Sequence, residues 1–542
     1  MVCVRLSDAA LAKAKAPVPE RRINLLRGAL DGVWNPNERF DIVIDPLGFD
    51  WVNRGEDRNW WWTVQQLPTL ELGAGDLLES SDIAPEKVHE FNHAVVRKWL
   101  LHCGDLSTDV PLAWNDLAAT FRLRNLFRYT NALIAHRPDY AALGFFVALV
   151  EEHSSWLAEE KNWSKGTNHG FFQARVMVEV AEGWPDVLGD YLPTGLGRLA
   201  FEVNSQFTSE GVHVENSPAY HLTISRNLKQ LAEYLSATGL DLPGVDIPRL
   251  LRDAEQWAVD ILTPSGDVPL IGDSESKPPQ SIPAGIKPQF GIVDKSASGW
   301  VVIREPKTET LPEAHLIFKN QHLSSYHRHD DDLAVHFSVG NDVFFGDSGL
   351  WSYQEDHPTR KYLRSSLAHS SVHIDGAKPI RKPGLLLAAP ETTLGRDRSW
   401  IQGRSWATEG WQIQRRLELY DSLRLWRIVD SVEPRSDVEG PPLEDPWEMV
   451  SVFVVPAGIE VKCTRQGAVL SGQFARVTLE CGGLSGEVPA ISCDSGAIMS
   501  PTYGAIERCT RLAFSQKSES AKVIFDVTVE GMGSQMVTAQ GA

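Results

Sequence analysis

The feature that most constrains the fold is a change in hydrophobic period near residue 285. Before this point, apolar side chains recur every three to four residues, and Val88, Phe91, Val95 and Trp99 lie on one such stripe. That spacing predicts an amphipathic helix. After this point, short segments alternate apolar and polar side chains and are separated by Gly, Asn, Asp and Pro, which predicts antiparallel strands. The expected fold class is therefore multidomain, with a helical domain followed by an all-β domain.

Further segments repeat the two patterns on either side of this change. Helices are predicted at 88–103, 113–136, 220–239 and 247–262, and strands at 300–306, 314–320, 333–339, 371–376, 411–434, 468–483 and 521–531. Between the two patterns, residues 274–289 are rich in Pro, Ser and Gly and have no period, as expected of a boundary. We therefore predict an α-helical domain with an N-terminal extension over residues 1–285 and an antiparallel β-sandwich over residues 286–542.

Charge and hydropathy exclude several classes of partner. The net charge of −19 argues against a nucleic-acid partner, and a polyanionic substrate would need a local basic cleft. No apolar run reaches the roughly 18 residues of a membrane span. Arg5 and Asp8 interrupt the apolar N-terminus, so no signal-peptide core is visible and a cytoplasmic location is expected. A periplasmic or secreted location stays open for a protein whose leader was removed or missed. The sequence also leaves the oligomeric state open, with a homodimer among the options.

The six cysteines do not form a metal motif. None lies in a CxxC pair, which argues against a thiolate zinc site. Cys463, Cys481, Cys493 and Cys509 all fall in the last 80 residues. A disulfide among them is open, but scattered reduced thiols are the favoured interpretation.

Histidine is concentrated in one part of the chain. Eight of the 16 histidines lie between residues 315 and 373. Each buried histidine needs a polar partner, so packing alone explains such crowding poorly, and a functional site is favoured. His327 and His329 stand just before three aspartates and an alternating apolar run over residues 333–339. A regular hairpin would place Asp347 opposite Val335, about 20 Å from His329. The two residues can share an ion only if residues 327–332 form a loop that folds back over the sheet.

Polar residues also interrupt the helical half. Asn168 and His169 precede an apolar helix, where Asn is a good cap. Glu215 and Tyr220 stand near the start of the helix predicted at 220–239. The aromatic run at 59–62 has two interpretations, a groove that stacks sugar rings or, more often for such residues, core packing.

Five motifs in order resemble the heparinase II/III-like polysaccharide lyases, including the related oligoalginate lyases. They are "TNHG" at 167–170, "EGVHVENSPAYH" at 210–221, "PLIGDS" at 269–274, "HRHDDDLAVHFSVGNDVFFGDSGLWSY" at 327–353 and "RKYLRSSLAHSSVHIDG" at 360–376. The resemblance covers roughly residues 90 to 380. It implies an incomplete (α/α) toroid followed by an antiparallel β-sandwich, with the site in the cleft between them. It also implies cleavage of a uronic-acid-containing polysaccharide or oligosaccharide by β-elimination.

The resemblance assigns roles to individual residues. Asn168 and His169 would hold the substrate carboxylate, because removal of the neighbouring C5 proton places a second negative charge beside it. Tyr220 and His327 would be the base and the acid, in an order that stays open. The substrate-binding candidates are Tyr353 or Tyr362, Arg360, Arg364 and Glu215.

The metal ligands implied by the resemblance are His329, Asp347 and His369. Two imidazoles and a carboxylate suit zinc, with manganese less favoured, and a structural ion that fixes the His327 loop is expected. Two positions depart from the family pattern, since Ser348 stands where Pro is usual and Ser370 where Asn is usual.

Two other functions remain open from sequence. A glycoside hydrolase on the same scaffold would need paired carboxylates, for which Glu210 with Glu215 or Asp273 with Glu275 are available. A non-catalytic carbohydrate-binding protein is the other, against which the intact Asn168, His169, Tyr220 and His327 argue.

Overall fold

The computed structural model describes residues 4–52, 57–75, 82–278, 285–320, 323–380, 390–435, 447–483, 488–517 and 521–532. His322, Cys3 and part of the predicted boundary segment, residues 279–284, lie outside these ranges. The chain divides into two compact units, each described by itself below. The first comprises Met1–Gln206 and Leu231–Asp246, and the second comprises Phe207–Gln230 and Ile247–Ala542.

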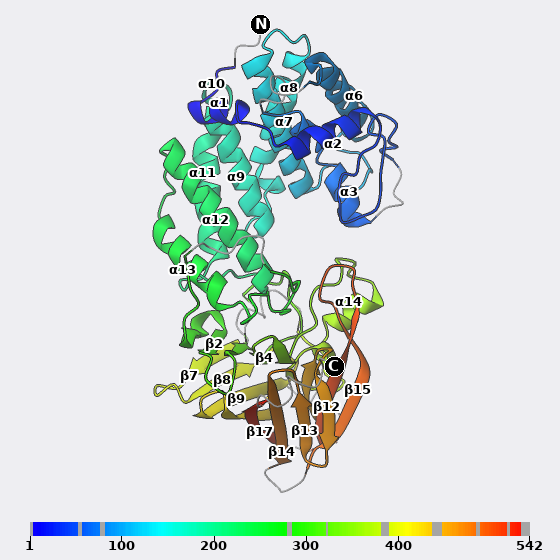
Figure 1. The fold of residues 1–542 in the computed structure, drawn as a ribbon. Helices are drawn as coiled ribbons and strands as arrows, with labels where there is room; N and C mark the ends of the chain where they lie inside the picture. The colour runs from blue at the N-terminus through cyan, green and yellow to red at the C-terminus, as the bar shows by residue number, and fades with distance from the viewer. Residues whose placement is uncertain are drawn as a thin grey trace. The chain divides into compact units, whose positions relative to one another are not determined.

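The first unit is helical. Its helices are α1 (Asp8–Ala14), α2 (Glu20–Leu30), α3 (Arg58–Val64), α4 (Thr69–Leu72), α6 (Pro85–Cys103), α7 (Asp116–His136), α8 (Leu143–Ala158), α9 (Asn168–Gly183), α10 (Pro185–Leu188), α11 (Leu192–Gln206) and the end of α12 (Pro218–Thr238). Helix α9 contacts both α7 and α11 (Figure 1). The stripe from Val88 to Trp99 is buried, as its period predicts. Trp60 and Trp61 belong to the same core, so packing is the correct interpretation for these two.

The described residues of the second unit form three antiparallel sheets (Figure 1). The first has the order β1 (Gly291–Lys295), β2 (Trp300–Glu305), β3 (Ala314–Lys319), β4 (Ala334–Val339), β5 (Asp342–Phe345). The second has the order β12 (Glu460–Thr464), β13 (Gly467–Ser471), β14 (Ala475–Gly483), β17 (Ala521–Gly531), β10 (Leu425–Pro434), β9 (Trp411–Asp421), β8 (Trp400–Ser405), β7 (Pro390–Leu394). The third has the order β15 (Ala490–Met499), β16 (Glu507–Lys517), β11 (Glu448–Val455), β6 (Val372–Ile374).

Alternation of side chains builds the core of this unit. Along β9, Trp411, Ile413 and Leu417 are buried, while Gln412, Gln414 and Arg416 on the other face are partly exposed. These side chains join residues of all three sheets in one cluster. Each of the seven predicted strand segments contains a strand, so the expected change from helices to antiparallel strands is confirmed. The predicted domain limit at 285/286 follows this change and stays a prediction, since the compact units divide the chain elsewhere.

Two elements of the second unit position the residues discussed below. Helix α13 (Ile247–Asp260) packs through Trp257 on Val302 and Ile317 of the first sheet. The β4–β5 hairpin turns tightly, with Val339 opposite Asp342, and it carries an irregularity between Phe337 and Ser338. Among the described residues, no helix combines the length and the apolar character that a bilayer crossing needs.

Candidate active site and metal centre

The loop between β3 and β4 carries the first histidine of the motif. Residues 323–333 form turns and bends and no strand, which is the folded-back loop that a shared ion requires. His327 adopts a left-handed backbone with φ +54°, a sparsely populated region for a residue with a side chain. The Nδ2 group of Asn216 donates to the carbonyls of Ser324 and Tyr326 at 2.7 and 2.9 Å and so holds the loop.

Tyr220 lies in the first turn of α12 against this histidine. Its ring stacks on the His327 ring at a centroid distance of 3.6 Å, and its hydroxyl lies 2.7 Å from that of Tyr353. Burial, followed by Tyr353 and then the carboxylates of Asp273 and Glu215, raises the pKa of Tyr220 well above 10. The phenol therefore keeps its proton in the free protein.

Two carboxylates flank the His327 ring. Asp273 Oδ2 lies 2.9 Å from Nδ1, and Glu215 Oε2 lies 3.6 Å from Nε2. Glu215 Oε2 is also 3.6 Å from Nε2 of the buried His213. Glu215 is 1% exposed, so in this structure it lies beside the histidine and not at an open surface. Its predicted contact with substrate remains untested.

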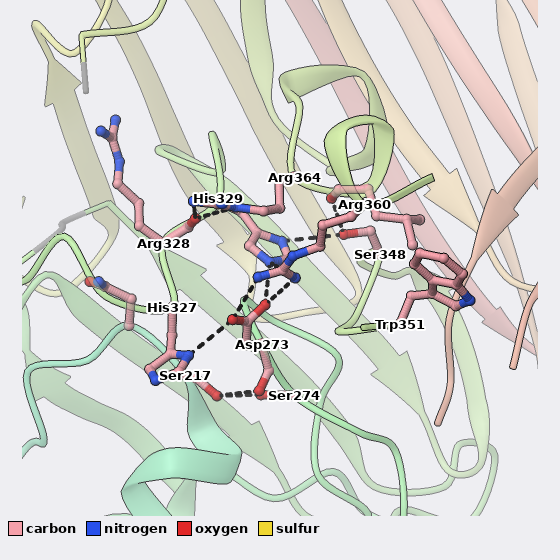
Figure 2. Close-up of polar contacts among 12 residues, drawn as sticks. Ser217, Asp273, Ser274, His327, Arg328, His329, Ser348, Trp351, Arg360 and Arg364 are labelled. Carbon is pink, nitrogen blue, oxygen red and sulfur yellow. Dashed lines mark hydrogen bonds and ion pairs between the residues drawn. The ribbon is translucent and has the colours of Figure 1, made fainter. Parts of the chain in front are cut away.

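Asp273 is the centre of the polar cluster in Figure 2. Its carboxylate also lies 2.8 Å from His329 Nε2 and forms a two-pronged ion pair with Arg360. Burial would raise the pKa of Asp273, but the hydrogen bonds from His327, His329 and Arg360 outweigh burial and hold it well below 3.8. The carboxylate is therefore ionised at neutral pH.

The backbone before Asp273 has room only for glycine. Gly272 has φ +57°, and a Cβ atom there would lie 2.6 Å from the Asn216 carbonyl oxygen and 3.2 Å from that of His327. Gly272 thus lets three chain segments meet: the Tyr220 helix start, the histidine loop and the Asp273 turn.

We expect Gly272→Ala to destabilise the protein by more than the ~1–2 kcal/mol of a left-handed alanine. Gly266→Ala is the matched control, because Gly266 has φ +84° and open space around its Cβ position. Overpacking adds about 1–3 kcal/mol at Gly272 alone. Urea unfolding of both variants measures the difference, and equal losses would contradict the close approach.

The three predicted metal ligands meet. One ligand atom from each of His329, Asp347 and His369 lies within 4.8 Å of the other two, and all three side chains are buried. After β5 the chain leaves β4, since Gly346 pairs with Val454 of β11, and this brings Asp347 back toward the loop. The geometric condition set by the sequence is met.

The donor set fits a zinc ion. His369 Nδ1 lies 2.7 Å from Asp347 Oδ1, while its Nε2 atom is buried with no hydrogen-bond partner in the described part of the chain. Burial lowers the pKa of His329, against the opposing effect of its hydrogen bond to Asp273. Burial also acts to lower the pKa of His369, but Asp347 outweighs it and the pKa is raised. Two imidazoles and a carboxylate would hold zinc and leave one position for another ligand.

If these residues hold a structural ion, His369→Ala should remove it. We expect purified protein to carry about one zinc per chain, and a ligand present at 1,000 times its Kd contributes about 4 kcal/mol of stability. Elemental analysis and thermal unfolding before and after chelation measure both effects.

His373→Ala is the matched control for this experiment. His373 is also a buried histidine, on β6, and does not belong to the cluster. It should keep the metal. Equal metal content in His369→Ala and wild type would contradict the assignment.

The other polar residues of the motif serve the fold. Asp331 pairs with Lys319 where both are fully buried, and Asp332 accepts a hydrogen bond from Ser405 at 2.6 Å. Arg328 donates to the Ile380 carbonyl and points away from the cluster (Figure 2). The two departures from the family pattern have local partners. Ser348 Oγ donates to the Leu363 carbonyl at 2.6 Å, and Ser370 Oγ to the Gly346 carbonyl at 2.7 Å.

Most of the remaining histidines of the crowded region are structural. His315 faces the Asp260 carbonyl, and His357 caps α14 (Pro358–Leu363) by accepting from the Thr359 amide. Burial lowers the pKa of both His336 and His373 to about 4. Among the described residues, the crowding therefore combines three site histidines, three buried strand histidines and the helix cap His357.

Both arginine candidates are engaged by groups of the protein itself. Arg360 is 2% exposed and its charge is neutralised by Asp273, so in this structure it supports the cluster from within, and its predicted contact with substrate stays a prediction. Arg364 donates to the Arg328 carbonyl at 3.1 and 2.9 Å and pairs with Glu355, which fixes the histidine loop.

Of the two tyrosine candidates, Tyr353 is the one that contacts Tyr220. Tyr362 instead lies near Arg511, Cys509 and Asp494, and burial raises its pKa.

Asn168 and His169 lie in the first unit at the start of α9. Thr167 is the cap, since its side chain accepts from the Gly170 amide, and Asn168 is the first helical residue. His169 Nδ1 lies 2.8 Å from Asp116 Oδ2. Burial would raise the pKa of Asp116, but the hydrogen bond with His169 and that with Ser164 lower it to about 2. His169 is therefore oriented by a carboxylate.

The carboxylate pairs required by a hydrolase are otherwise engaged. Glu210 accepts from the Ser298 amide and hydroxyl at 2.8 and 2.5 Å. Asp273 is bound to two histidines and Arg360, and Glu275 forms an ion pair with Lys277.

Sequence reasoning gave no role in the site to Asn216 or Asp116, and it considered Asp273 only as a hydrolase carboxylate. A signal existed for two of them, because Asn216 and Asp273 stand inside motifs that carry the family resemblance. Asp116 lies outside those motifs.

The described residues thus combine a helical half, antiparallel sheets, and a tyrosine–histidine pair near a two-histidine, one-aspartate cluster. Residues 86–290 match the family described as heparinase II/III N-terminus, and residues 289–534 match heparinase II/III-like, C-terminal. The chain belongs to the heparinase II/III-like polysaccharide lyase family. A search of the curated proteins finds no match.

Solved structures share the fold. The crystal structure of a heparinase III superposes with a TM-score of 0.73 at 16% identity, covering 98% of this chain and 86% of that one. A mutant of the heparan sulfate lyase HepC from Pedobacter heparinus gives a TM-score of 0.69 at 14% identity, covering 97% and 86%. The expected fold class, a helical half followed by antiparallel sheets, is therefore confirmed and matches the fold of the heparinases.

Proposed function

We propose that this protein cleaves a uronic-acid-containing polysaccharide or oligosaccharide by β-elimination. The observation that carries the proposal is the contact between Tyr220 and His327, two groups able to exchange protons, in a chain of the lyase family. Elimination requires one group to take the C5 proton and another to protonate the leaving oxygen O4. The C5–H and C4–O4 bonds break, a C4=C5 double bond forms, and no water is added.

We assign the acid role to Tyr220 and the base role to His327. A phenol whose pKa is raised well above 10 is a poor base, yet it holds a proton ready for the departing O4. The proton from C5 then goes to His327, where the carboxylates of Asp273 and Glu215 stabilise the resulting imidazolium. The Tyr353 hydroxyl is hydrogen-bonded to that of Tyr220, so Tyr353 can relay a proton between solvent and Tyr220 or orient the phenol.

We assign the substrate carboxylate to Asn168 and His169. An amide and an imidazole can both donate to a carboxylate, which stabilises the charge that develops when the C5 proton leaves. Asp116 supports this role, since it holds His169 through Nδ1. A zinc ion held by His329, Asp347 and His369 would supply structure to the loop of His327, two residues from the ligand His329.

A panel of uronic-acid polymers tests the function. Heparan-type chains, alginate, hyaluronan-like chains and bacterial exopolysaccharides are incubated with the protein. Ultraviolet absorbance detects the unsaturated uronide, and mass spectrometry weighs the products. A lyase conserves the summed mass of the substrate, while a hydrolase adds one water for each cut. Hydrolysed products, or binding without turnover across the panel, would overturn the proposal.

A further inference from the structure

One carboxylate contacts both the base and a predicted metal ligand. Asp273 Oδ2 lies 2.9 Å from His327 Nδ1, and Oδ1 lies 2.8 Å from His329 Nε2 (Figure 2). The guanidinium of Arg360 donates to both oxygens, and its Nη1 also lies 3.5 Å from His329 Nε2. Asp273 is 2% exposed and Arg360 is 2% exposed, so neither contact is shared with bulk water.

An ionised carboxylate only accepts hydrogen bonds. Each ring nitrogen that faces Asp273 must therefore carry the proton, and the other nitrogen of each neutral ring must carry the lone pair. In His327 the lone pair falls on Nε2, the nitrogen required of a base. In His329 it falls on Nδ1, the nitrogen left to bind an ion. The two rings are held in opposite tautomers by the two oxygens of one side chain.

The turn that carries Asp273 is itself fixed. Ser217 Oγ donates to the Asp273 carbonyl at 3.0 Å and lies 2.9 Å from Ser274 Oγ, and Ser274 Oγ donates to the Ile271 carbonyl at 2.7 Å. Gly272 packs against the carbonyl of His327. These side-chain and main-chain contacts thus hold Asp273 within hydrogen-bonding distance of both histidines.

We propose that Asp273 is a positioning residue that sets the tautomer and orientation of His327 for proton transfer and of His329 for metal binding at the same time. The inference rests on the proposed lyase function for the role of His327 and on the proposed ion for His329. Arg360 completes the device by balancing the charge of a carboxylate that is shared between two rings.

Asp273→Asn tests the proposal with little change of shape. One face of an amide donates, so it cannot accept from both histidines, and one ring must turn or change tautomer. We expect kcat to fall about 10²–10⁴-fold with KM changed less than about threefold. We expect zinc affinity, measured by competition with a chromophoric chelator, to fall about 10–100-fold. Asp332→Asn is the matched control, the same change in a carboxylate that binds Ser405, and it should leave both values within about threefold.

Nitrogen-15 spectra of histidine-labelled wild-type protein give a readout that needs no variant of Asp273. Long-range proton–nitrogen correlations, assigned with His327→Gln and His329→Gln, should show a proton on His327 Nδ1 and on His329 Nε2. A bare nitrogen at either position would overturn the proposal. So would Asp273→Asn that folds with unchanged kcat and unchanged zinc affinity.

These measurements distinguish a failure of the positioning role of Asp273 from a failure of the proposed lyase function. The tautomer and zinc measurements do not depend on turnover, so they decide the role of Asp273 even where the polymer panel shows no cleavage. Lyase activity with wild-type kcat in Asp273→Asn would sink the positioning role and leave the proposed function standing. If Asp273→Asn does not fold, the wild-type spectra still decide.

Discussion

Tyr220→Phe and His327→Ala are expected to lower kcat about 10²–10⁴-fold each on the substrate that the panel identifies. Phenylalanine keeps the stacked ring at 3.6 Å and removes only the hydroxyl that faces Tyr353, so substrate binding should change little. His327→Ala removes the proton acceptor. Initial rates of ultraviolet absorbance over a range of substrate concentrations give kcat and KM separately.

A tyrosine away from the site controls for the loss of one hydroxyl. Tyr420→Phe removes an exposed hydroxyl on β9 that donates to Glu418, and it should leave kcat within about twofold. The double variant of Tyr220 and His327 should lose little more than either single variant, because acid and base act in one step. Full activity in both single variants would remove these residues from the mechanism.

Arg415→Leu is expected to cost about 3–5 kcal/mol of unfolding free energy, the largest single effect on stability. Arg415 and Asp430 are both fully buried, and two hydrogen bonds of 2.7 Å join them. Arg415 also donates to two main-chain carbonyls, that of Leu333 at the end of the histidine loop and that of Ser370, which follows the last predicted metal ligand. The variant leaves the Asp430 charge uncompensated in the core. Guanidinium unfolding measures the loss.

A surface pair on the neighbouring strands is the control. Arg427 and Asp526 form a similar two-pronged pair at 2.7 and 3.1 Å, but about a third or more of each side chain is exposed. Arg427→Leu should cost no more than about 1 kcal/mol. Arg415→Leu combined with Asp430→Leu should recover part of the loss, because no buried charge then remains unpaired. A cost at Arg415 equal to that at Arg427 would show that burial does not set the energy of this pair.

The local elements of the fold could be predicted from sequence because their signals are local. The stripe through Val88 and Val95 and the alternation along β9 report the burial of one face, and both periods were present in the chain. From the sequence, the proximity of His329 and Asp347 could be stated only as a requirement for a shared ion and could not be predicted. It depends on Gly346 leaving the hairpin to pair with Val454, more than a hundred residues away.

The contact partners of a side chain were harder to predict than the secondary structure of the segment that carries it. Arg360 was expected at the substrate because a guanidinium can bind a carboxylate or sulfate with two hydrogen bonds, and its pairing with Asp273, which joins positions 87 residues apart, leaves no local pattern in the sequence. Asp273 had no visible partners because its neighbours come from the loop after β3 and from α14. The choice between Tyr353 and Tyr362 needed the position of Tyr220, which no spacing rule gives.

The Asn216 side chain holds the histidine loop through main-chain carbonyls of that loop. Its amide grips the carbonyl oxygens of Ser324 and Tyr326, and every amino acid offers the same oxygen. Side chains at 324–326 can therefore drift through evolution without releasing His327, whereas the amide at 216 cannot be exchanged for an apolar group. Tyr326 is 52% exposed, so the residue type at this exposed position can change while His327 stays in place.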